Sequence, residues 1–192
     1  MKNVMRVAAF CAAVLSAGAA LAAERYVLDA SHSQVVFAYD HLGFSTTRGM
    51  FSGFSGEIMF DQEDPAASSV TVEMPVMSMF TGWEKRFGHF MSDDFFGASE
   101  GDMIRFVSTG IEVTGGATAL ITGDLTMNGV TKPVTLDAVL NKAGDHPQAG
   151  KPWAGFDATA RLMRSDFDLG RFAPFVGDEV RIDISVEAMK AE

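Results

Sequence analysis

The segment Gly123-Asp124-Leu125-Thr126-Met127-Asn128-Gly129-Val130-Thr131-Lys132-Pro133-Val134-Thr135-Leu136 carries the clearest structural signal in this chain of 192 residues. On both sides of the dipeptide Asn128-Gly129, apolar and polar residues alternate, which is the pattern of a β-strand with one buried face. Asn and Gly both tolerate the positive φ angles that a two-residue hairpin turn requires. The segment therefore predicts a β-hairpin whose turn lies at Asn128-Gly129.

The same alternation recurs along most of the chain. It marks eight segments, in the ranges 35–39, 54–60, 70–74, 104–106, 119–127, 134–140, 156–162 and 180–188. Each has an apolar face and a face of charged or hydroxyl-bearing residues, as expected for an antiparallel sheet with one side in water. Eight such strands can close into a barrel that holds side chains or one small ligand. The sequence thus predicts an all-β fold, an antiparallel eight-stranded barrel. A two-sheet sandwich shows the same alternation and stays the structural alternative.

One segment departs from the alternation. Its large apolar residues recur at helical spacing: Trp83, Phe87, Phe90 and Met91. Thr81 is a candidate N-cap, and the acidic pair 93–94 is unfavourable near a helix C-terminus, so we expect the helix to end by Ser92. A short helix near one end of a barrel either plugs that end or forms a lid over a pocket, and the sequence favours neither.

Residues 1–22 have the features of a cleaved signal peptide. Two basic residues precede an apolar run, and Ala20 and Ala22 place small side chains at the two positions that a signal peptidase reads. Cleavage is predicted after Ala22, with cleavage after Ala23 as the alternative. The apolar run is shorter than the about 20 residues of a membrane span. Residues 23–192 are then expected to form a single secreted domain.

Charge and cysteine content restrict the function. Removal of Lys2 and Arg6 from the 15 basic residues leaves 13 against 25 acidic residues, a net charge of −12. A surface this acidic repels nucleic acids and anionic membranes, so no nucleic-acid partner is expected. The only cysteine, Cys11, lies in the predicted signal peptide, which excludes thiol catalysis and thiolate metal ligands after cleavage.

No motif in the sequence predicts an active site. The four histidines lack the spacing of metal-binding motifs, and the segment 53–57 only partly imitates a nucleophile elbow because Glu57 replaces the final glycine. The 16 Phe and 12 Met residues of the chain instead supply a large and adaptable apolar interior. Such an interior without a reactive group points to holding a ligand rather than converting it. No catalytic residue, metal site or cofactor is predicted.

The chain after the signal peptide resembles the YceI family over its whole length. The resemblance rests on the order and spacing of short motifs: Tyr26-Val27-Leu28-Asp29, His32-Ser33, His41-Leu42-Gly43-Phe44-Ser45, Gly49-Met50-Phe51, Thr81-Gly82, Ile104-Arg105-Phe106, the hairpin from Gly123 to Val134, Arg164-Ser165-Asp166-Phe167 and Asp178-Glu179-Val180. Two departures stand out. Phe87 replaces the usual Asp, which favours an apolar lid for the helix, and Gly101-Asp102 replaces the usual Tyr-Pro.

The resemblance implies a lipocalin-like barrel in the periplasm. Its long apolar pocket would hold a polyisoprenoid, such as a quinone tail or a prenyl lipid, as a ligand and not as a cofactor. Family members are often dimers, so a homodimer is compatible with the resemblance, and the protein is not expected to be embedded in a membrane. A neutral quinone head suits a net charge of −12. A pyrophosphate head would need basic partners, for which Lys85, Arg86 and Arg48 are candidates, although all three also fit a solvated surface.

The predicted ligand-binding residues are the apolar residues at strand positions expected to face inward, together with those on the apolar face of the helix. They are Val35, Phe37, Tyr39, Phe54, Ile58, Phe60, Val72, Met74, Trp83, Phe87, Phe90, Phe106, Ile121, Leu125, Phe156 and Leu162. An inward aromatic residue on a barrel strand is also ordinary core packing, so part of this set is expected to be core. Arg164 and Asp166 are interpreted as a structural ion pair.

Three functions remain open at this point. The leading one is periplasmic binding, transport or storage of a long-chain isoprenoid lipid. The second is a lipid isomerase or cyclase in which His41 or His89 acts as the base, since histidine titrates near neutral pH. The third is a filled barrel without a cavity that serves as a partner of a membrane redox complex.

Overall fold

The computed structural model describes residues 22–192 of the chain, so all of the predicted signal peptide except Ala22 lies outside the described residues. The elements in chain order are β1 (Glu24–Leu28), β2 (Gln34–His41), β3 (Ser45–Phe51), β4 (Ser55–Phe60), η1 (Pro65–Ala67), β5 (Ser69–Pro75), η2 (Val76–Ser78), α1 (Glu84–Met91), β6 (Met103–Val113), β7 (Thr118–Met127), β8 (Val130–Asp145), β9 (Pro152–Met163), η3 (Arg164–Phe167) and β10 (Val176–Lys190).

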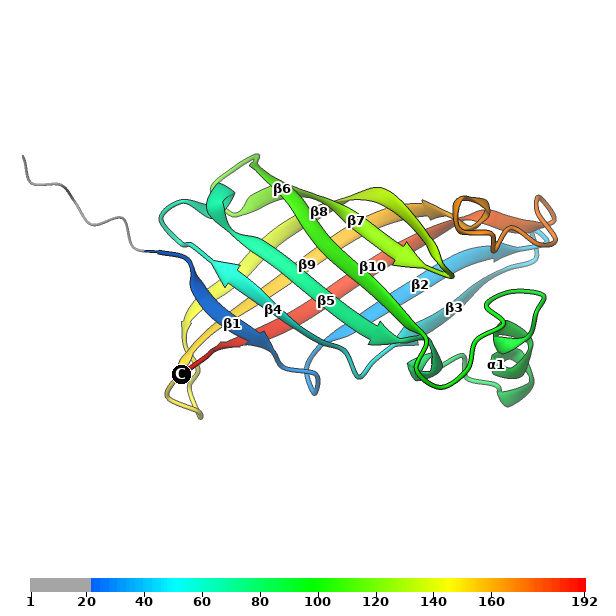
Figure 1. Cartoon of the computed structure of the whole chain (residues 1–192), viewed down its shortest axis with the longest axis horizontal. Coiled ribbons are helices and arrows are strands. Elements are labelled where there is room, and N and C mark those ends of the chain that lie inside the picture. Colours follow the sequence, from blue (N-terminus) through cyan, green and yellow to red (C-terminus); the bar gives the residue numbers. More distant parts are fainter. Residues whose placement is uncertain (1–21) are drawn as a thin grey trace, which may run out of the picture.

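The strands form one antiparallel barrel. β4 to β10 pair in chain order, and β1 pairs with both β4 and β10, so that β1 and β4 to β10 make a closed ring of eight strands (Figure 1). The predicted eight-stranded antiparallel barrel is therefore confirmed. The eight predicted segments correspond to β2 and β4 to β10, and the strand that closes the ring is β1, which the alternation did not reveal.

β2 and β3 extend the barrel at one end. β9 occupies one edge of β10, and β1 and β2 share the other edge, end to end. β1 pairs with the last residues of β10, 188–190, whereas β2 pairs with the range 176–185 and carries β3 on its outer edge. A backbone bridge between Met50 and Phe80 ties β3 to the segment that leads into α1. The barrel wall is thus prolonged beyond the closed ring.

The hairpin between β7 and β8 has the predicted two-residue turn. Met127 pairs with Val130, and Asn128 and Gly129 have φ angles of 53° and 74°. Both values lie in the left-handed region that Asn and Gly tolerate best. The Asn128 side chain also donates a hydrogen bond of 3.0 Å to the backbone carbonyl of Phe167, which attaches the turn to η3.

Two glycines leave room for the aromatic rings of neighbouring strands. A Cβ atom on Gly49 would be 2.3 Å from the ring of Phe37, and one on Gly123 would be 2.4 Å from the ring of Phe106 and 2.6 Å from the carbonyl oxygen of Val107. Such distances are far inside van der Waals contact. The absence of a side chain at these two positions therefore determines how the rings line the interior.

The helix α1 lies outside the ring, beside β3 at the end where β2 and β3 extend the wall (Figure 1). It ends at Met91 with Ser92 as its C-cap, as predicted. The predicted N-cap is wrong, because Trp83 occupies that position without a side-chain cap. The hydroxyl of Thr81 instead donates to the carbonyl of Trp83 at 2.9 Å, so it stabilises the turn before the helix.

The apolar side chains of the barrel fall into two buried clusters. The cluster near β1 is built around the rings of Tyr26, Phe60 and Phe156. The ring of Phe60 meets those of Tyr26 and Phe156 edge to face, with centroid distances of 5.7 Å and 5.4 Å. The larger cluster occupies the other part of the barrel and includes Phe37 and Phe167. Helix α1 packs against this larger cluster through Phe90, whose ring lies 6.4 Å from that of Phe37. Among residues 22–192, no helix is long and apolar enough to cross a membrane.

Candidate functional site

A cavity of about 350 Å³ occupies the interior of the barrel. Side chains from every strand line it, and nearly all of them are apolar. Its wall includes three alanines on neighbouring strands, Ala138 on β8 and Ala158 and Ala160 on β9. Ala138 and Ala158 face each other across the β8–β9 pair, so the wall carries no large side chain at this place. Space remains in the barrel because short side chains stand where larger ones would fill it.

A second, smaller chamber of about 100 Å³ lies at the α1 end. Phe51, Met127, Leu162 and Ile182 line both spaces, so the two are adjacent and share a wall. Aromatic rings dominate the second chamber: Phe37, Tyr39, Phe51, Phe90, Phe95 and Phe96. A filled barrel would contain neither space, so the structure does not fit the third function considered from the sequence.

The structure brings most of the predicted ligand-binding residues together. The main cavity is lined by Val35, Phe54, Ile58, Phe60, Val72, Met74, Phe106, Ile121, Leu125, Phe156 and Leu162. The second chamber is lined by Phe37, Tyr39, Phe90 and Leu162. Two predicted residues lie elsewhere. Trp83 is 57% exposed and packs under the guanidinium of Arg86, while Phe87 packs against the larger cluster without lining either space.

Two residues that line the second chamber carry polar groups, Tyr39 and Arg164, while the surface that the chamber exposes is almost entirely apolar. Burial raises the pKa of Tyr39, against the opposing effects of a hydrogen bond with Thr47 and the charges of Arg86 and Arg164. Burial likewise lowers the pKa of Arg164. A buried hydroxyl in an otherwise apolar chamber can orient a ligand that carries one polar end.

Arg164 does not form the ion pair with Asp166 that the sequence suggested. Its guanidinium donates instead to the backbone carbonyls of Leu169 and Arg171 in the connection between β9 and β10, and to those of Val176 and Gly177 at the start of β10, both at 2.9 Å. A planar fork of five N–H groups suits such a set of carbonyls. Arg164 therefore organises this connection, and its donors are largely engaged within the protein.

The basic residues proposed for a pyrophosphate head lie outside both spaces. Lys85 and Arg48 are exposed, and Arg86 donates to the carbonyl of Thr81 at 3.0 Å. The two histidines considered as catalytic bases also do not line the cavity. His41 is exposed, and His89 contacts Asp94 at 3.2 Å on the surface. Neither histidine is therefore in position for acid–base chemistry on the contents of these two spaces.

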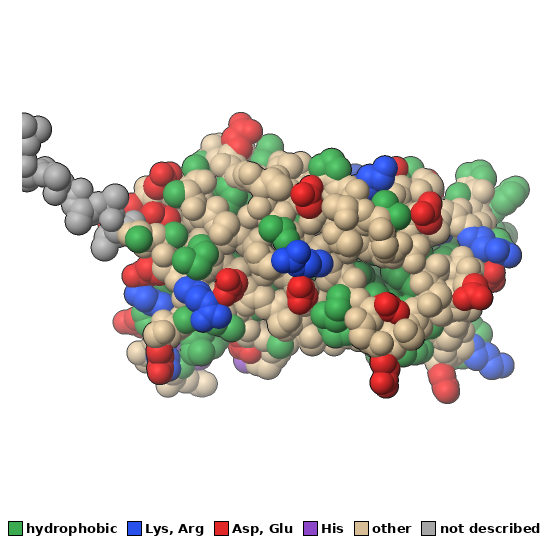
Figure 2. Space-filling view, in the orientation of Figure 1, with side chains coloured by type: hydrophobic (Ala, Val, Ile, Leu, Met, Phe, Trp, Pro, Cys, Tyr) green, Lys and Arg blue, Asp and Glu red, His purple; other side chains and the backbone are tan. Residues whose placement is uncertain are grey.

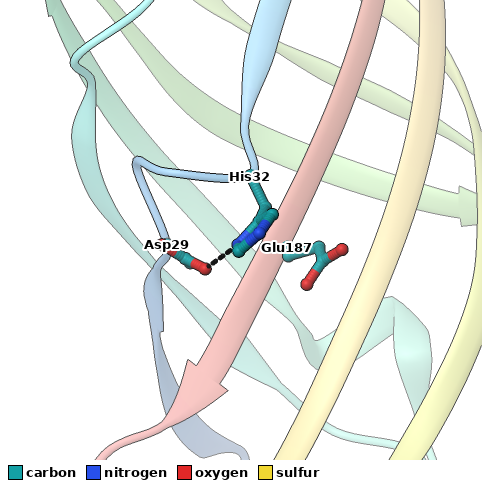
Figure 3. A group of neighbouring side chains, drawn as sticks. All are labelled: Asp29, His32 and Glu187. Carbon is teal, nitrogen blue, oxygen red and sulfur yellow. Dashed lines mark hydrogen bonds and ion pairs between the residues drawn. The ribbon is translucent and has the colours of Figure 1, made fainter. Parts of the chain in front are cut away.

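Within residues 22–192, one group of three side chains has the composition of a metal site: Asp29, His32 and Glu187 (Figure 3). Their ligand atoms lie within 4.8 Å of one another. Each carboxylate already accepts a hydrogen bond, Asp29 from His32 at 2.7 Å and Glu187 from Trp153 at 2.8 Å. Hydrogen bonds from Ser31 and then from His32 lower the pKa of Asp29, and the bond to Asp29 raises the pKa of His32.

This group fixes the turn between β1 and β2. The amide of Asp29 donates to the carbonyl of Glu187 at 2.8 Å, and the amide of Glu187 donates to the hydroxyl of Ser33 at 3.2 Å. The turn lies where the chain leaves β1 and begins β2 along the same edge of β10. The Asp29–His32 contact therefore stabilises the turn that joins β1, the last strand of the closed ring, to β2, the first strand of its extension.

Comparison with known proteins identifies the family. The model of the YceI-like domain matches residues 26–188. Protein YceI of Escherichia coli O157:H7 is 38% identical over 192 residues, covering 99% of both chains. The chain belongs to the YceI family.

Solved structures agree with the barrel of this YceI domain. The crystal structure of Burkholderia cenocepacia BcnA has a TM-score of 0.75 at 26% identity, covering 83% of this chain and 98% of the other. A polyisoprenoid binding domain from Saccharophagus degradans, implicated in plant cell wall breakdown, has a TM-score of 0.65 at 13% identity, covering 86% and 98%. At that identity, the second comparison concerns the fold alone.

Several lining residues of the YceI domain were not predicted, although the sequence contained the signal for most of them. Val134, Leu136 and Leu140 on β8 and Ile182, Ile184 and Val186 on β10 have the inward parity of their strands, and all line the main cavity. Phe51 on β3 gave no such signal, because the strand Ser45–Phe51 is mostly polar. Leu169 and Phe95 lie on connections, where periodicity has no meaning.

Proposed function

We propose that this YceI-family protein binds one long-chain isoprenoid lipid, of the quinone or polyprenyl type, and carries or stores it in the periplasm. The observation that supports this most directly is the pair of adjacent apolar chambers, about 350 Å³ and 100 Å³, enclosed by one barrel. Each buried CH₂ group of a hydrocarbon tail contributes about 0.8 kcal/mol, so a tail needs no polar contact to bind tightly. The polyisoprenoid binding domain that shares this fold is consistent with such a ligand.

The polar end of the lipid is proposed to lie in the second chamber, next to the hydroxyl of Tyr39. A neutral head such as a quinone fits this position better than a pyrophosphate. The nearby guanidinium of Arg164 already donates to backbone carbonyls, so a dianionic group would have to compete for its N–H groups. A chain with a net charge of −10 adds no long-range attraction for an anion.

Native mass spectrometry tests the proposal. The full chain is expressed in a Gram-negative cell with its own N-terminal segment and purified from the periplasm without detergent, and the bound material is then extracted into organic solvent. We expect a discrete added mass that extracts as a quinone or prenyl lipid. A protein that carries no lipid and takes up none when mixed with quinones or polyprenyl phosphates would refute the proposal.

A further inference from the structure

An exposed apolar tip lies at the end of the molecule that carries the second chamber. We define the tip by four residues, Leu42, Phe44, Phe172 and Phe175. Phe44 is 90% exposed and Phe175 is 74% exposed, and the other two are close to half exposed. They belong to the turn between β2 and β3 and to the connection between β9 and β10, at the right-hand end in Figure 1, where Figure 2 also shows hydrophobic side chains at the surface.

The two turns of the tip are held in place by the protein. The amide of Leu42 donates to the carbonyl of Phe175 at 3.0 Å, and the amide of Val176 donates to the carbonyl of Phe172 at 2.9 Å. Arg164 also donates to the carbonyls of Leu169 and Arg171 in the same connection. Leu42 and Phe172 have φ angles of 59° and 66°, a conformation that bulky residues seldom adopt. A rigid turn that presents large apolar residues in a strained conformation is a candidate for a functional contact.

The tip borders the second chamber. The ring of Phe172 lies 6.0 Å from that of Phe95, which lines the chamber. Met163, which lines the chamber as well, is itself partly exposed. A surface in contact with the tip would therefore lie next to the part of the container in which we place the polar end of the lipid.

The two segments that carry the tip residues differ in composition from the rest of this acidic chain. The segments 42–46 and 169–177 contain no acidic residue and one basic residue, Arg171, in a chain with a net charge of −10. Arg171 contacts Asp94 at 3.1 Å, and Asp40, Asp168 and Asp178 flank the two segments. The two segments that carry the apolar side chains thus contain no acidic group, which the phosphates of a bilayer would repel, although acidic residues border both of them.

The tip is too small for a stable contact with a second copy. A fully buried aromatic side chain contributes about 150–250 Å², and the tip has three, each already partly covered. The sum lies below the about 800 Å² per partner of a stable protein interface. Insertion between lipids needs no such area, because apolar side chains at the acyl boundary bind by their burial alone.

We propose that the apolar tip docks this protein on the surface of a lipid bilayer, with Phe44 and Phe175 inserted at the boundary between head groups and acyl chains. The inference rests on the proposed function, since a protein that exchanges a water-insoluble lipid with a membrane must bring its container to that membrane. The bilayer is expected to be zwitterionic or weakly charged at the contact, because the chain as a whole is acidic.

Binding to vesicles of phosphatidylcholine tests the docking. The variants are F44S, F175S and the double variant, and F80S is the matched control. Phe80 is 65% exposed but lies opposite Met50, at the other end of β3 from Phe44. Each single variant should lower the vesicle partition coefficient about tenfold and the double variant about a hundredfold, whereas F80S should bind like the wild type. All forms share the same N-terminus, so any contribution from that segment is common to them.

A second readout follows the tip itself. In F44W the fluorescence emission should shift to shorter wavelength when vesicles are added. The absence of a shift, or wild-type binding by the double variant, would overturn the proposal. Light scattering after size exclusion tests whether the tip instead contacts a second copy of the chain. If the wild type forms a dimer that the double variant abolishes, and the wild type does not bind vesicles, the proposal is overturned.

Lipid retention separates this proposal from the proposed function. F44S/F175S should keep the lipid seen in native mass spectra of the wild type while losing vesicle binding, because neither phenylalanine lines the cavity. Vesicle binding by a wild-type protein that never holds lipid would leave the docking in place and refute the carrier function. Lipid retention together with tip-independent vesicle binding would refute only the docking.

Discussion

The alanine wall of the main cavity gives a test of where the lipid lies. Ala158 on β9 faces the cavity next to Ala138 on β8 and Ile184 on β10. The substitution A158F adds an aromatic ring on the inner side of the wall, where the short side chains leave space. The matched control is T159F, because the next residue of a strand points to the opposite face. Thr159 is exposed on the outside of the barrel.

The expected loss of affinity follows from the volume that the new ring takes. The substitution adds six carbons, and an isoprene unit has five, so the ring displaces about one unit of the tail. At about 0.8 kcal/mol per CH₂ the loss would be about 4 kcal/mol, and at the about 0.3 kcal/mol per atom typical of larger ligands it would be about 1.5 kcal/mol. The dissociation constant should therefore rise between about tenfold and a thousandfold.

The assay is a titration of lipid-free protein with quinones of defined tail length, with the bound fraction measured by native mass spectrometry. A158F should bind a tail one isoprene unit shorter nearly as well as the wild type does, since the ring fills the place of that unit. T159F should bind all tails like the wild type. Equal binding by A158F and the wild type at every tail length would refute the placement of the tail along this wall.

Three further predictions concern the parts of the fold that shape the container. G123A should lower the free energy of unfolding by about 1–3 kcal/mol in urea denaturation, because its Cβ would meet a ring and a backbone carbonyl, whereas G110A has open space and should be neutral or stabilising. R164K should cost about 1–3 kcal/mol in the same assay, because a lysine cannot satisfy the carbonyls that the guanidinium bridges. In H32Q the loss of thermal stability should be greatest between about pH 4 and 6.5. Because the pKa of His32 is raised in the folded protein, its contribution to stability is complete below pH 6.5 and is lost as the pH rises through that raised pKa. Because the pKa of Asp29 is lowered, its contribution to stability is complete above pH 3.8 and is lost as the pH falls through that lowered pKa. Melting temperatures of H32Q and wild type that differ equally at pH 5.5 and pH 9 would contradict this account.

The sequence predicted the barrel because apolar and polar residues alternate along most of its strands, so that one face of each strand is apolar and buried. β3 escaped prediction for a physical reason. Its inner positions include Gly49, whose missing side chain is replaced by the ring of Phe37 from the neighbouring strand. At this position the apolar inner surface is supplied by Phe37 of β2, so no pattern within Ser45–Phe51 could reveal it. β1 is short and has only Tyr26 and Leu28 buried, too few for a pattern.

The part of the candidate site that lies on strands was predictable, because alternate residues of a strand face the interior of the barrel. The predicted residues on strands line at least one of the two spaces. Trp83 and Phe87 do not: Trp83 precedes α1 and is exposed, and Phe87 packs against the larger cluster without reaching either space. The role of Arg164 had no signal in the sequence either. Its partners are backbone carbonyls, which every residue has, and only the course of the connection from 168 to 177 brings them to one guanidinium.

The length of β10 explains why the container suits a linear molecule. Its 15 residues span about 50 Å, whereas β1 pairs only with residues 188–190, which is about 10 Å of the same edge. The remaining edge needs a second partner, and β2 can reach it only because the chain turns between Asp29 and Ser33. Without that turn the barrel would be a short ring with one chamber. With it, β2, β3 and α1 add lining residues for a second chamber that shares a wall with the first, so the turn extends the interior in the way that the proposed tail requires.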